Sequence, residues 1–200
     1  MPFRWRSGLG TIIVAMLSTT EAARPADESW PCVQRRVPEL TVAQMWAGPP
    51  VDPVANRWRD DPAVASLART LASRRTNLNE AAAAIERFAQ AAGPEKDAKL
   101  TLLFAGAFEL INAERRRLIG GIERYARKQK LLADAITSTS QILRLGDRPE
   151  TERAALAQKL QWDTRIYDDR NQALTYVCES PVLLEQRAFT LAQEIARHLE

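Results

Sequence analysis

Apolar residues recur at helical spacing along most of the chain after residue 60. Across residues 62–92 they return every three, four or seven positions, after an Asp61-Pro62 pair that has the form of a helix N-terminus. Gly93-Pro94 then acts as a strong terminator. The pattern predicts a first helix over 62–92. A break near Thr76-Asn77 is the alternative, because Arg74 and Arg75 interrupt the apolar line.

Two longer helices are expected after it. The apolar line over residues 95–145 continues without a proline, which predicts one long helix, weakened and bent at most by Gly120-Gly121. Residues 146–149 (Gly-Asp-Arg-Pro) form the next turn. The third helical stretch covers residues 150–199 and contains Ser180-Pro181, where we expect a kink, with the start of a separate helix as the alternative.

The lengths of these helices predict a specific all-α architecture. Short turns make consecutive helices antiparallel neighbours. The 62–92 helix would cover the 95–145 helix only from Glu95 to about Tyr125. The prediction for residues 61–200 is therefore a three-helix antiparallel bundle with a projecting two-helix, coiled-coil-like arm. The arm would be tipped by Gly146 and extend about 30 Å.

Residues 24–60 are expected to be irregular. They hold six of the eleven prolines together with Trp30, Trp46 and Trp58, and only residues 41–46 suggest a helical turn. Such a Pro/Trp-rich segment would dock on the bundle with its tryptophans as anchors.

The first 23 residues have the form of a secretory signal peptide. Arg4 and Arg6 precede an apolar stretch over residues 9–17, and small residues allow cleavage near Ala22 or Ala23. The apolar stretch is much shorter than the ~20 residues of a membrane-spanning helix, so we expect no permanent span after cleavage. The predicted location is the periplasm, with an uncleaved anchor as the alternative.

The two cysteines gain meaning from that location. In an exported protein, an even cysteine count favours a disulfide, here Cys32–Cys178. A redox-active pair or an intermolecular bond is the alternative, although no C-x-x-C motif is present. Closing so long a loop would stabilise the fold by roughly 4–5 kcal/mol on the chain-entropy model.

Charge and motif content exclude several functions. The formal net charge is +3, and the 28 basic and 25 acidic residues interleave along the chain, so no nucleic-acid partner is expected. The single histidine, His198, lies near the chain end and has no evident catalytic partner. No phosphate loop, nucleophile elbow or haem site is found, and we expect neither a catalytic residue nor a cofactor.

Acidic residues of the third helix are weak candidates for a metal site. Asp163, Asp168, Asp169 and Glu179 supply the oxygen ligands that hard cations prefer. Antiparallel counting favours another role, cross-helix ion pairing on a solvated face with four basic residues of the middle helix: Arg124, Arg127, Lys128 and Lys130.

Two short segments are candidates for partner contact. Arg115, Arg116 and Arg117 could bind a phosphate or an acidic partner, although three consecutive helical residues point in three directions and a solvated face is the ordinary interpretation. Around Cys32, the side chains of Trp30, Gln34 and Arg35 could form a docking edge. A structural role, with Trp30 packed on the bundle, is favoured for that segment.

The same segment carries a resemblance. Residues 30–34 (W-P-C-V-Q), 37–40 (V-P-E-L) and 46–50 (W-A-G-P-P), with 176–181 (Y-V-C-E-S-P), resemble a group of uncharacterised periplasmic helical proteins of alphaproteobacteria. The resemblance implies the same compartment and assigns no activity.

Together these observations predict a non-enzymatic exported protein that acts by protein contact, as an accessory, scaffold or chaperone-like periplasmic factor. The alternative is a periplasmic protein that binds a metal or small ligand through the acidic third helix.

Overall fold

The computed structural model describes residues 30–52 and 55–199; the predicted signal peptide lies outside these ranges. The described residues form helices and irregular segments and contain no strand. In chain order the helices are α1 (Val42–Met45), α2 (Pro62–Ala72), α3 (Leu78–Ala91), α4 (Lys96–Leu145) and α5 (Glu150–Ala196), with 3₁₀ turns at Arg57–Arg59 and Gly93–Glu95. The predicted all-α class is confirmed.

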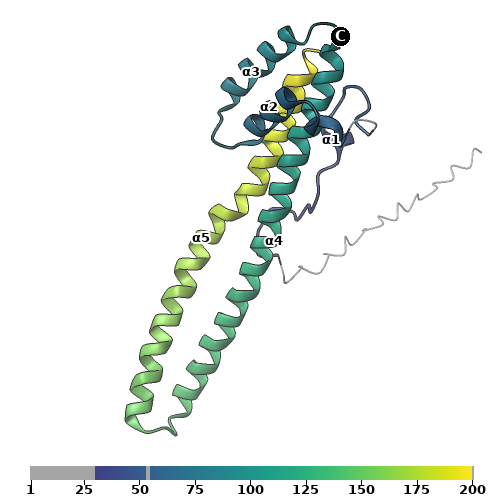
Figure 1. Cartoon of the computed structure of the whole chain (residues 1–200). Coiled ribbons are helices and arrows are strands. Elements are labelled where there is room, and N and C mark those ends of the chain that lie inside the picture. The colour runs from purple at the N-terminus through teal and green to yellow at the C-terminus, as the bar shows by residue number, and fades with distance from the viewer. Residues whose placement is uncertain (1–29, 53–54, 200) are drawn as a thin grey trace, which may run out of the picture.

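The antiparallel helices α4 and α5 form the axis of the molecule (Figure 1). The turn between them follows Gly146, whose φ of 70° lies in the left-handed region that glycine adopts without strain. Tyr125 donates to the carbonyl of Arg170, and Gln129 donates to that of Tyr167. These pairs are centred close to the predicted turn, as expected for a helical hairpin. Both long helices were therefore correctly predicted.

The predicted single helix over residues 62–92 is wrong, and its alternative break is confirmed. Helix α2 ends at Ala72, and the next residue, Ser73, has an extended backbone. Asn77 caps the start of α3 by accepting a hydrogen bond from the amide of Glu80 at 2.8 Å. An asparagine in this position satisfies a helix-end amide that would otherwise lack a partner. The break lets α2 pack on α4 while α3 packs mainly on α5.

The main hydrophobic core lies at the end of the long helices where α1, α2 and α3 gather (Figure 1). We call this region the head. Its largest fully buried side chains come from the 3₁₀ turn at Arg57–Arg59 and from α2, α3, α4 and α5: Trp58, Val64, Leu71, Ile85, Leu100, Leu103, Phe104, Ile111, Leu184 and Ile195. A core assembled from α2, α3 and both long helices at one end explains why the head can hold the long helices together.

The tryptophans of the N-terminal segment anchor it on the head, as predicted. Trp46 is buried and stacks on Phe104, with ring centroids 4.2 Å apart. Trp58 is fully buried against α4 at Gly106, where a Cβ atom would lie only 2.8 Å from the indole ring. Glycine at this position therefore lets the large ring approach the helix backbone.

Glu109 of α4 contacts both the buried Trp58 and the exposed Arg59. Its carboxylate accepts hydrogen bonds from Arg59 and from Nε1 of Trp58, and the Arg59 guanidinium lies 4.2 Å from the centre of the Trp58 ring. The hydrogen bond from Arg59, aided by that from Trp58, lowers the pKa of Glu109 below its ordinary value of 4.5, although partial burial opposes the shift.

A pH dependence follows from this lowered pKa. A carboxyl group whose pKa is lower in the folded state stabilises the fold above its ordinary pKa of 4.5, and this contribution is lost as the pH falls through the folded-state value. We expect the free energy of unfolding of the wild type to fall more steeply below pH 4.5 than that of Glu109→Gln. Urea unfolding of both proteins across that range tests this; parallel curves would contradict it.

Helix α5 continues through Pro181 without a break in the chain of helical residues. The alternative of a separate helix starting at Ser180-Pro181 is therefore wrong. Proline has no amide hydrogen, so the carbonyl four residues earlier loses its helical donor. Neighbouring elements have to hold this turn of α5 in place.

Candidate partner-binding site

A disulfide fastens the N-terminal segment to α5. Cys32 and Cys178 are bonded, with their Cα atoms 5.6 Å apart, which confirms the predicted pairing. Cys178 belongs to a small apolar cluster with Ile122 and Leu174, and half-buried Trp30 packs against that cluster. The Trp30 indole also donates to the carbonyl of Gln34 at 2.7 Å. Trp30 thus has the predicted structural role beside the disulfide.

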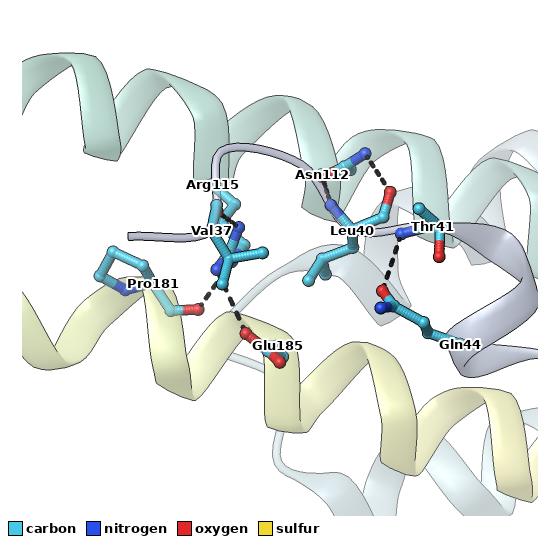
Figure 2. Close-up of polar contacts among 8 residues, drawn as sticks. All are labelled: Val37, Leu40, Thr41, Gln44, Asn112, Arg115, Pro181 and Glu185. Carbon is cyan, nitrogen blue, oxygen red and sulfur yellow. Dashed lines mark hydrogen bonds and ion pairs between the residues drawn. The ribbon is translucent and has the colours of Figure 1, made fainter. Parts of the chain in front are cut away.

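Arg115 joins three parts of the molecule (Figure 2). From α4 it donates to the carbonyl of Pro181 at 3.2 Å, to the carbonyl of Val37, and to the carboxylate of Glu185 at 3.2 Å. The residue is only 2% exposed. Burial lowers the pKa of Arg115, and the neighbouring Glu185 carboxylate opposes that shift. The expectation that Arg115 lies on a solvated face is therefore wrong.

The other two arginines of the predicted cluster act separately. Arg116 is exposed and forms an ion pair of 3.0 Å with Glu39 of the N-terminal segment. Arg117 is also exposed and pairs with Glu114 on its own helix. The three residues do not form a single basic patch, because successive helical side chains are rotated by about 100°.

Asn112 is a contact that sequence reasoning missed. Its side-chain amide makes two hydrogen bonds with the backbone of Leu40, as acceptor at 3.1 Å and as donor at 3.3 Å (Figure 2). Asn112 directly follows the buried Ile111 of α4, and both Asn112 and Leu40 are buried. Asn112 therefore fixes the path of the N-terminal segment one helical turn from Arg115.

A groove of about 650 Å³ lies between the N-terminal segment and α5. Four of the six predicted partner-contact residues line it: Trp30, Gln34, Arg35 and Arg115. Arg116 and Arg117 do not. Phe189, which is 45% exposed, contributes an apolar side chain from α5. The groove therefore combines two aromatic residues, two arginines and side-chain amides within one concave surface.

The second candidate surface is the part of the helical hairpin that extends beyond the head, residues 123–173, which we call the arm. It projects well away from α1, α2 and α3 (Figure 1). Its α4 half contains 23 residues, which span about 35 Å at 1.5 Å per residue. The predicted projecting arm is thus present.

The arm contains very little core. Its buried residues are the polar Gln129 and Thr139, both from α4. Large apolar side chains instead face the solvent: Leu131 is 68% exposed, Leu145 is 76% exposed and Trp162 is 63% exposed. An element with this distribution contributes little hydrophobic stabilisation to its own fold.

The acidic candidates on α5 do not form a metal site. Asp163 pairs with Lys159 one turn away on its own helix, and Asp168, Asp169 and Glu179 are exposed. In the described ranges no group of three or more His, Cys, Asp or Glu residues could hold a metal ion.

The expected cross-helix ion pairs between these acidic residues and α4 are not observed in the described part of the chain. Lys130 pairs instead with Asp134, one turn along its own helix. His198, in the turn that follows α5, lies 3.5 Å from Glu194 of that helix.

Comparisons with known proteins add no further assignment, since no protein-family model, curated protein or solved structure matches the chain. Among the described residues, no helix combines the length and apolar content needed to cross a membrane.

Proposed function

We propose that this chain is an exported, non-enzymatic protein that acts by protein contact in the bacterial periplasm, as an accessory, scaffold or chaperone-like factor. The Cys32–Cys178 disulfide supports an oxidising compartment, because such bonds persist outside the reducing cytosol. The predicted signal peptide, cleaved near Ala22 or Ala23, and the resemblance to alphaproteobacterial periplasmic proteins support the same location.

The composition of the arm carries the proposal of protein contact. A hairpin of this length that buries only Gln129 and Thr139 is not needed to complete the head, whose core is formed elsewhere. It nevertheless presents Leu131, Leu145 and Trp162 to solvent. Exposed large apolar and aromatic side chains are typical of surfaces that bind other proteins.

Site-specific crosslinking tests this proposal. A photoreactive amino acid would replace Leu131 or Trp162 in the full chain, expressed in its source cells, and the periplasmic extract of those cells would be irradiated. We expect discrete, saturable adducts at both positions. Unlabelled wild-type protein added to the periplasmic extract should suppress them, whereas a Leu131→Glu/Trp162→Glu double variant should not.

The matched control places the same photoreactive residue at Gln90, an exposed position on α3 in the head. Adducts of equal yield and identity at Gln90 would show nonspecific capture and contradict a contact role for the arm. The absence of any saturable adduct at Leu131 and Trp162 would also contradict it. Circular dichroism and thiol counting would first verify that each variant is folded and oxidised.

A further inference from the structure

A second buried arginine, Arg187, lacks the partners that Arg115 has. It lies on α5 and is only 8% exposed. Its Nε atom donates to the carbonyl of Leu71 at 2.7 Å, in the last turn of α2, but Nη2 is buried without a hydrogen-bond partner. No carboxylate in the described part of the chain forms an ion pair with it. Arg115, in contrast, reaches Glu185.

An unpaired buried guanidinium is energetically costly. Removing a charge from water is strongly unfavourable unless hydrogen bonds and an opposite charge compensate. Burial lowers the pKa of Arg187, and no neighbouring acidic group opposes this shift. A guanidinium stays charged at neutral pH, so the position favours an anion supplied from outside the chain.

The surroundings of Arg187 indicate which kind of anion fits. Arg187 lines a hollow of about 450 Å³ together with Gln186, Thr190 and three apolar side chains. These three are exposed large hydrophobic residues: Leu78 at 41%, Leu183 at 54% and Phe189 at 45%. An anion with an attached apolar chain would therefore satisfy the arginine and cover the rim of the hollow.

The start of α3 adds a second favourable feature. Leu78 is the first residue of this 14-residue helix, so the helix N-terminus lies at the edge of the hollow. Helix N-termini carry a partial positive charge that favours anions. The start of α3 at the edge of the hollow thus adds to the positive charge of Arg187.

We propose that the hollow at Arg187 binds a free aliphatic monocarboxylate of medium chain length. Its carboxylate would accept hydrogen bonds from the guanidinium, and its hydrocarbon chain would pack on Leu183 and Phe189. This site lies in the head and is independent of the contact role proposed for the arm.

Calorimetric titration of the oxidised full chain with octanoate tests the proposal. We expect saturable binding of one octanoate per chain. Acetate, which lacks the hydrocarbon chain, and octan-1-ol, which lacks the carboxylate, should each bind at least about tenfold more weakly. Arg187→Met should weaken octanoate binding by a similar factor, whereas Arg69→Met, an exposed arginine on α2, should leave it unchanged.

A second variant protects the test against misfolding of Arg187→Met. Leu183→Asp changes an exposed side chain of the rim and leaves Arg187 in place, and it should also lose octanoate binding by charge repulsion. Equal binding of octan-1-ol and octanoate, or wild-type affinity in Arg187→Met, would overturn the proposal. So would the absence of saturable octanoate binding, or tight binding only of a peptide with an apolar C-terminal residue.

Discussion

Removing the disulfide with Cys32→Ala/Cys178→Ala is expected to lower the free energy of unfolding by about 5 kcal/mol relative to the oxidised wild type. The bond joins residues separated by 146 positions, and the loss of chain entropy in the unfolded state grows with the length of the closed loop. Urea unfolding of both proteins under oxidising conditions measures the difference.

The reduced wild type provides the control for this experiment. In the presence of dithiothreitol it should unfold at nearly the same urea concentration as the double variant, because both then lack the same crosslink. Equal stability of oxidised wild type and double variant would contradict the prediction. Two free thiols in protein recovered from its native compartment, detected by alkylation and mass spectrometry, would remove its premise.

Arg115→Met is expected to lower the free energy of unfolding by about 3 kcal/mol. The substitution keeps much of the side-chain volume but leaves the carbonyls of Val37 and Pro181 without their donor. Removing one partner of a buried polar network costs this much because the remaining groups stay desolvated. Urea unfolding at neutral pH measures the loss.

The neighbouring residue offers a matched control. Arg116→Met removes an exposed ion pair with Glu39, and exposed pairs contribute less than about 1 kcal/mol. A loss in Arg116→Met equal to that in Arg115→Met would show that general charge, and not the buried contacts, stabilises this region.

The features that sequence predicted well depend on local rules. Both long helices follow from an unbroken apolar period, and the turn between them follows from Gly146 and Pro149. The disulfide followed from the inferred compartment and the even cysteine count. Trp46 and Trp58 were assigned as anchors because large aromatic side chains in an irregular segment gain most from burial.

The features that sequence predicted poorly depend on angular position around a helix. Arg115 lies four residues after Ile111 and four before Ile119, both buried residues of α4. This spacing places Arg115 on the buried face and could have predicted its burial. Arg187 similarly lies between Leu184 and Leu191. We expected Arg115 to be solvated because it is charged, although its position on the helix indicated burial. The expected cross-helix ion pairs failed because antiparallel counting gives the height of a residue along the axis and not its direction.

The missing amide hydrogen of Pro181 has a consequence for the orientation of the arm relative to the head. The backbone of α5 alone is less stiff at this level, and two contacts brace it. Cys178 is bonded to Cys32 of the N-terminal segment, and the Pro181 carbonyl accepts a hydrogen bond from Arg115 of α4, which also donates to the carbonyl of Val37 in that segment. The N-terminal segment therefore helps to fix the angle between the arm and the head. Reducing the disulfide would therefore leave α4 and α5 helical but let the orientation of the arm relative to the head vary more.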